Sequence, residues 1–175
     1  MRRSLPRHAL LSLVRALVVS KFNYCNSVLA GISGNLICQL QSVMNAAAHL
    51  VFSAKRSDHI TALLCELHWL KVPERIQFRL SVLACRCLHN TAPVYLAESL
   101  QLTRNVDARR RLRSADSMTL VVPATCCSTL GDRAFPVSAA WSWNTLPSGV
   151  RAAPSLASFW RKLKQTLFLQ SFPDD

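Results

Sequence analysis

Apolar residues recur at helical spacing through the first fifty positions of the chain. The first group falls at Leu10, Leu13, Val14 and Leu17. Residues 36–51 then keep a single apolar stripe over four turns. This 3.6-residue periodicity is typical of amphipathic helices that pack against one another. We therefore predict a first helix that ends near Ser20 and a second helix over residues 36–51.

Two further helices are predicted in the middle of the chain. Ser57 or Asp58 is expected to cap a short helix that runs to His68, because a side-chain oxygen can accept from the N–H groups of a first helical turn. A longer helix begins near Pro73 and is apolar most of the way round, which is typical of a central position in a bundle. We expect it to end at Asn90, since asparagine tolerates a left-handed conformation after a helix.

The pattern becomes polar after a short fifth helix that starts at Pro93. Residues 101–118 read QLTRNVDARRRLRSADSM. Such a polar, arginine-rich stretch is typical of a loop between two packed parts. We therefore predict a helical bundle over residues 1–100, a basic linker over 101–118 and a small C-terminal tail over 119–175.

The predicted tail mixes strand and helix signals. The β-branched run TLVVP at residues 119–123 predicts a short strand, and RAF at 133–135 is expected to pair with it across the Gly131–Asp132 turn. SAAWSWN predicts one or two helical turns. Pro154 is expected to open a last helix with one shared face, formed by Leu156, Phe159, Trp160, Leu163 and Leu167. The expected fold class is mainly α, with a helical bundle followed by a small α+β tail that carries a short hairpin.

Composition and charge narrow the class of protein. Half of the 175 residues are hydrophobic and 17% are charged, which predicts a packed core. The formal net charge is +12, and no acidic residue precedes Asp58. Such an excess favours a polyanionic partner, either a nucleic acid or an acidic membrane surface.

The N-terminal segment also raises the question of targeting. Its basic, acid-free start resembles a mitochondrial presequence, but an amphipathic helix of the domain itself is the preferred interpretation. Arg15 interrupts the apolar run, and no stretch reaches the roughly 18 uncharged residues that span a bilayer. We expect an intracellular protein of the nucleus or cytoplasm without a membrane partner. A mitochondrial or membrane-surface basic helical protein stays open as an alternative.

Two segments, HITALLCELH at residues 59–68 and CRCLH at 85–89, hold potential metal ligands. Cys65 and His68 share a helix face, but Cys85 and Cys87 are two residues apart and point to nearly opposite sides of a helix. We therefore predict no metal site, no cofactor and mostly buried, reduced thiols. A small Cys/His metal-binding or thiol enzyme remains the alternative from another functional class.

Eight blocks of the sequence, in order, carry a family resemblance. They are YCNSVLAG (24–31), LQSVMNAAAHLV (40–51), DHITALLCELHWLKVPERI (58–76), CLHNTAPVYL (87–96), LRS (112–114), LVVPAT (120–125), GDRAFPVSAAWSWNTLP (131–147) and FWRKLKQTLF (159–168). Together they resemble the C-terminal end of the reverse transcriptase polyprotein of jockey-like and chicken-repeat-like LINE elements, which are non-LTR retrotransposons.

The resemblance implies a thumb-like bundle and the tail that follows it, with template and primer handling as the associated role. The metal-binding aspartates of that family lie upstream of the matched blocks, so no catalytic residue is carried over. The final FPDD does not replace them, because Pro173 is unsuited to a central strand. Met1 falls inside the family pattern, and we therefore expect a truncated fragment that is not an enzyme alone.

Binding to the RNA or DNA backbone is the activity that we expect of such a fragment. An arginine run donates in forks to phosphate oxygens. The first candidates for this contact are Arg109, Arg110, Arg111 and Arg113. Weaker candidates are Arg75, Arg133, Lys162 and Lys164. A solvated linker is the alternative interpretation of the run, and a core position is the preferred interpretation of Trp143.

Overall fold

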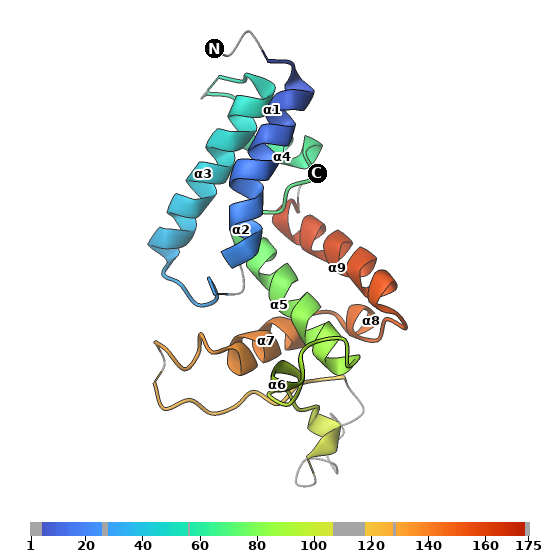
Figure 1. Cartoon of the computed structure of the whole chain (residues 1–175). Helices are drawn as coiled ribbons and strands as arrows, with labels where there is room; N and C mark the ends of the chain where they lie inside the picture. Colours follow the sequence, from blue (N-terminus) through green and yellow to red (C-terminus); the bar gives the residue numbers. More distant parts are fainter. Residues whose placement is uncertain (1–4, 26–27, 56, 107–117, 128, 174–175) are drawn as a thin grey trace. The chain divides into compact units, whose positions relative to one another are not determined.

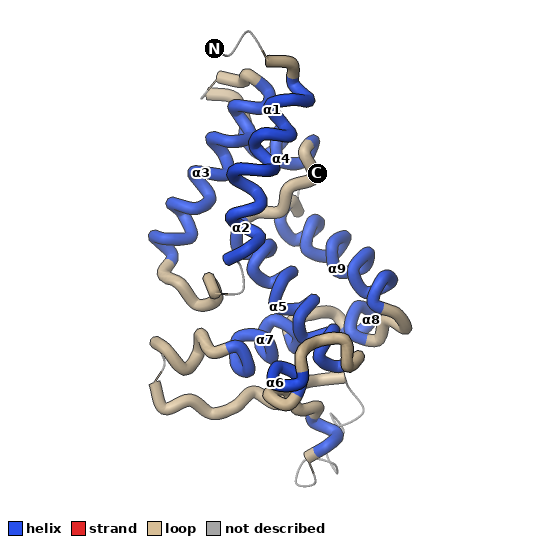
Figure 2. The backbone as a smooth tube through the Cα atoms, viewed as in Figure 1, coloured by secondary structure: helices blue, strands red, loops and turns tan. Residues whose placement is uncertain are grey.

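The structure, a computed structural model, describes residues 5–25, 28–55, 57–106, 118–127 and 129–173 (Figure 1). These residues are mainly helical, as the sequence predicts, and the remaining described segments are loops and turns (Figure 2). The chain divides into two compact units. The first contains residues 1–75 and 167–175, and the second contains residues 76–166. The predicted three-part organisation stays a prediction.

The first unit opens with a helix that changes its winding midway. It comprises α1 (Arg7–Val14), a π-helical stretch (Arg15–Val19) and α2 (Ser20–Cys25), which follow one another without a break. The first predicted helix is confirmed, but it continues beyond Ser20 to Cys25.

The second helix of this unit, α3 (Gly34–Phe52), confirms the helix predicted over residues 36–51. Its buried positions form one stripe at Met44, Ala47, Ala48 and Val51. The helix contacts both α1 and α4 (Ile60–Glu66). Gln41 adds a polar link, because its Oε1 atom accepts from the N–H of Val72 at 2.8 Å.

The predicted cap of the third helix is wrong. The residue before α4 is His59, and no side chain caps the helix. The Asp58 carboxylate instead accepts from the N–H of Lys55 at 2.7 Å, so it closes the preceding turn. The helix also ends before His68, which has a left-handed φ of 52°. Its N–H donates to Cys65 O at 2.9 Å and so satisfies a carbonyl at the helix end.

Aromatic contacts tie the final residues of the chain to this unit. The Phe168 ring lies 5.9 Å from the His68 ring and 5.0 Å from the Phe172 ring. The Lys71 ammonium lies 5.2 Å from the centre of the Phe172 ring, within the range of a cation–π contact. The segment that precedes α5 (Val72–Leu88) therefore packs on the C-terminal residues.

The second unit holds the remaining helices. It contains most of α5, then α6 (Val94–Ala97), a 3₁₀ turn (Thr103–Asn105), α7 (Phe135–Asn144), α8 (Ser148–Arg151) and most of α9 (Leu156–Ser171). The predicted helices that begin near Pro73, Pro93 and Pro154 are thereby confirmed. Asn90 follows α5 with a left-handed φ of 53°, as expected.

Trp143 forms the centre of the second unit. Its side chain is 2% exposed and stacks on the Phe159 ring at a centroid distance of 5.4 Å. Its indole N–H donates to the Met118 carbonyl at 2.6 Å. The interpretation of Trp143 as a core residue is therefore confirmed. Gln77 links α5 to the end of α7, because its Nε2 donates to Thr145 Oγ1 at 3.0 Å.

The predicted hairpin is wrong, and the described part of the tail contains no strand. Residues 133–135 do not pair with residues 119–123, because α7 begins at Phe135. The extended segment instead forms an isolated antiparallel bridge between Leu120 and Leu102. The Asn144 amide completes it: Leu120 N–H donates to Asn144 Oδ1 at 2.9 Å, and Asn144 Nδ2 donates to Leu120 O at 2.8 Å.

Replacing Asn144 with Ala should destabilise the protein by about 1–3 kcal/mol, because both backbone groups of buried Leu120 lose their partner. Urea unfolding followed by circular dichroism measures this change. Gln165→Ala, at an exposed helical position, is the control and should stay within about 0.5 kcal/mol of the parent. Equal stability of the two variants would show that the amide bridge does not hold the segment.

Candidate nucleic-acid interface

The arginine run of the predicted linker cannot be placed. Arg109, Arg110, Arg111 and Arg113 all lie outside the described residues. Their role as phosphate contacts stays a prediction from the sequence.

Arg75 has structural partners within the first unit. Its Nε donates to Leu70 O at 2.9 Å, and its guanidinium lies 5.8 Å from the centre of the Trp69 ring. Burial lowers the pKa of Arg75 to about 10, so the group stays protonated at neutral pH. These contacts give the cation a role in packing, and a phosphate would have to compete with them.

The other three candidates are exposed and belong to the second unit. Arg133 lies two residues before α7. Lys162 on α9 donates from Nζ to the Gly149 carbonyl at 3.0 Å and so links α9 to α8. Lys164 also lies on α9. The structure therefore brings only Lys162 and Lys164 together on one element.

The exposed side of α9 contains two residues that were not among the sequence candidates. Phe159 and Leu163 are buried, and Trp160, Arg161 and Lys164 are exposed. Because residues three and four apart are neighbours on a helix, Lys164 lies one turn beyond both Trp160 and Arg161. We call these three residues the α9 basic face. Helical spacing predicts Trp160 on the same face as Phe159 and Leu163, but Trp160 is 46% exposed, so this prediction is wrong. Its charge was the signal that could have identified Arg161.

The sequence around this face contains basic residues and no acidic ones. Residues 133–173 contain Arg133, Arg151, Arg161, Lys162 and Lys164, and no Asp or Glu. Arg151 has a partner within the protein, since its Nε donates to Leu146 O at 3.1 Å. Within the described residues, the side chains of Arg161 and Lys164 have no hydrogen-bond or ion-pair partner. Both cations are thus available to a ligand in solvent.

The cysteine and histidine segments do not assemble into a metal site in the described part of the chain. No three His, Cys, Asp or Glu side chains there lie close enough to hold an ion. Among the cysteines whose side chains are described, only Cys85 and Cys87 are buried, so the prediction of mostly buried thiols is wrong. His59, His68 and His89 are exposed. Burial raises the pKa of Cys85 to about 11. Burial also raises the pKa of Cys87, although the Arg86 charge acts in the opposite direction.

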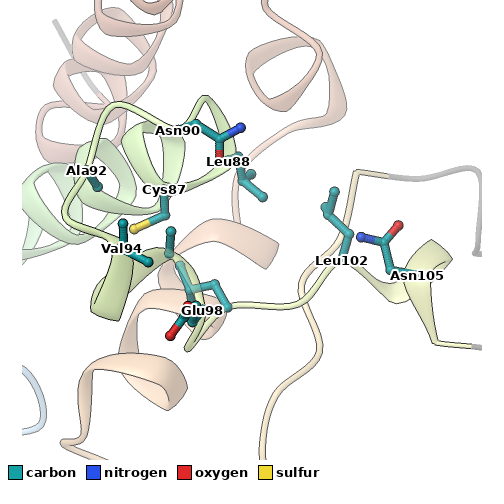
Figure 3. A pocket seen from close by; sticks show the side chains of 10 residues that line it. Cys87, Leu88, Asn90, Ala92, Val94, Glu98, Leu102 and Asn105 are labelled. Carbon is teal, nitrogen blue, oxygen red and sulfur yellow. The ribbon is translucent and has the colours of Figure 1, made fainter.

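A pocket of about 410 Å³ lies beside α6 in the second unit (Figure 3). Leu88 at the end of α5, Val94 in α6 and Leu102 contribute apolar side chains, and Asn90 and Asn105 contribute polar ones. Glu98 is the only charged residue among those lining this pocket. A carboxylate repels phosphate, so the pocket is not suited to a nucleic-acid backbone.

Comparisons with protein-family models, with curated proteins and with solved structures found no match to this chain. Within the described residues, every helix is too short or too polar to cross a bilayer.

Thiol reactivity should divide the cysteines into two groups at pH 8. Cys38, Cys126 and Cys127 are exposed and should be alkylated first. Cys85 and Cys87 should react only after unfolding, because they are buried and their raised pKa disfavours the reactive thiolate. Peptide mapping after timed alkylation, with a denatured sample as the control, measures the order. Early labelling of Cys85 would contradict its burial in α5.

Proposed function

We propose that this chain is the C-terminal part of a non-LTR retrotransposon reverse transcriptase polyprotein, acting in the nucleus or cytoplasm. In this proposal it has no catalytic activity alone and binds the RNA or DNA backbone without sequence preference. Eight ordered sequence blocks support the family assignment. The mainly helical fold agrees with the bundle that this resemblance implies.

The α9 basic face is the observation that carries the proposed binding. Phosphate groups attract exposed cations and release condensed counterions when they are neutralised. Arg161 donates in a planar fork that fits phosphate oxygens, and Lys164 adds a point charge one turn away. Contacts of this kind fix the position of a protein on the backbone and read no base sequence. Non-specific binding is therefore the expected outcome.

In this proposal, the catalytic residues belong to the upstream regions of the polyprotein. In the family that this chain resembles, the metal-binding aspartates lie upstream of the eight matched blocks. The matched blocks therefore contain no counterpart of that carboxylate pair. The acidic residues in the described part are Asp58, Glu66, Glu74, Glu98 and Asp132. Glu66 pairs with Arg7 at 2.6 Å, and Asp132 accepts from Thr125 Oγ1 at 2.7 Å. These two carboxylates therefore have internal structural partners.

Removing both cations of the α9 basic face should weaken the salt dependence of binding. For Arg161→Ala with Lys164→Ala, the log-log slope of affinity against salt should fall by about 1.4–1.8, since each neutralised phosphate contributes roughly 0.7–0.9. Fluorescence anisotropy on a labelled RNA at several salt concentrations measures the slope.

The matched control for this double variant removes two exposed cations from the first unit, with Arg15→Ala and Lys21→Ala. Both double variants carry the same net charge, so a general charge effect would change both slopes equally. An effect confined to the α9 variant supports the proposed interface. An unchanged slope in a folded α9 variant would remove this face from the proposal.

The linker run is tested separately. Replacing Arg109, Arg110, Arg111 and Arg113 with Ala should lower the slope by about 2–4, assuming two to four phosphate contacts. The affinities for an RNA hairpin and for an unrelated DNA duplex should fall together, because backbone contacts carry no sequence information. The same anisotropy titrations measure both. An unchanged slope would identify the run as a solvated linker only.

A further inference from the structure

We propose that the α9 basic face is a stacking platform for single-stranded nucleic acid, with Trp160 holding an unpaired base. This inference rests on the proposed backbone binding and adds the class of ligand. Its basis is the combination of one exposed indole and two cations on a single helix face.

The geometry of α9 leaves the Trp160 ring accessible. The side chain is 46% exposed, although its neighbour Phe159 is 1% exposed and stacks on Trp143. The exposed residue one turn before Trp160 is Ala157, which has a small side chain. Lys164 is one turn after Trp160 on the same face. A base could therefore stack on the indole while its flanking phosphates contact Lys164 and Arg161.

Stacking chemistry favours single strands over duplexes. A base in a duplex is already stacked on both faces, so an exposed indole gains nothing from it unless the duplex opens. An unpaired base has a free face, and its stacking on an aromatic side chain is worth roughly 1–3 kcal/mol. Cations without an aromatic ring would bind either form of nucleic acid through phosphates alone. Trp160 is thus the residue that would make binding to a single strand tighter than binding to a duplex.

The other tryptophans show what is specific to this position. Trp143 and Trp69 are buried, at 2% and 5% exposed. Trp141 on α7 is 48% exposed and so matches Trp160 in accessibility. However, residues 135–144 contain no Lys or Arg, whereas Trp160 is followed directly by Arg161. Trp141 therefore provides a control for exposed aromatic surface without neighbouring charge on its helix.

The experiment measures the affinity of the full chain for a labelled oligouridine and for a blunt duplex with the same number of phosphates. The parent should bind the single strand more tightly at equal salt. Trp160→Ala should weaken single-strand binding by about tenfold, as expected for the loss of one stacked base, and leave duplex binding within about twofold. Trp160→Phe should keep most of the affinity, because a phenyl ring also stacks on a base.

Trp141→Ala is the matched control and should leave both affinities unchanged. Circular dichroism of each variant tests whether the fold is intact, and Trp160→Phe keeps the comparison valid if the alanine variant unfolds. Equal affinity for both ligands, unaffected by Trp160→Ala, would overturn the stacking platform and leave backbone binding intact. Equal losses with Trp141→Ala would also overturn it. Failure of the parent to bind either ligand would overturn the proposed function itself.

Discussion

The packing of Trp143 is the interaction on which the second unit depends. One face of the indole stacks on Phe159 of α9, and its N–H donates to Met118 O in the extended segment before α7. A buried indole needs a partner for its N–H, and this carbonyl supplies it. The next residue, Asn144, satisfies Leu120 in the same segment. Two consecutive residues of α7 thus fix both a neighbouring helix and a strand-like segment.

This packing also determines which side of α9 meets solvent. Because Phe159 and Leu163 are four residues apart and buried, the helix rotation is set by the core. Trp160, Arg161 and Lys164 are then left on the exposed side of the helix. The proposed binding face is in this sense a consequence of the core position of Trp143.

Periodic segments of this chain were predictable, whereas long-range partners were not. The stripe in α3 and the helix stop at Asn90 follow from local spacing and local backbone preference. The β-branched run at residues 119–122 has the same appearance whether its partner is a strand or a side-chain amide. Its real partners, Leu102 and Asn144, are distant in sequence and carry no local signal. The α9 basic face itself stays a proposal. Lys164 was a candidate because of its charge, whereas the exposure of Trp160 depends on the rotation of the helix, which the sequence spacing did not give.

A shortage of acidic residues imposes a further constraint on the cations. With few carboxylates available, several cations donate to backbone carbonyls near helix ends: Arg75 to Leu70, Arg86 to Thr91, Arg151 to Leu146 and Lys162 to Gly149. Each bond gives one N–H of the cation an acceptor and occupies a backbone carbonyl, although Nη1 of Arg151 stays buried without a partner among the described residues. Such a bond fixes the position of the charge and leaves only the remaining N–H groups of the cation for a phosphate. Arg161 and Lys164 make no such bond in the described structure, a condition that they share with the exposed Arg79 and Arg104 of the same unit. What sets them apart is their position beside an exposed tryptophan on one helix, and it is on this combination that the proposed interface rests.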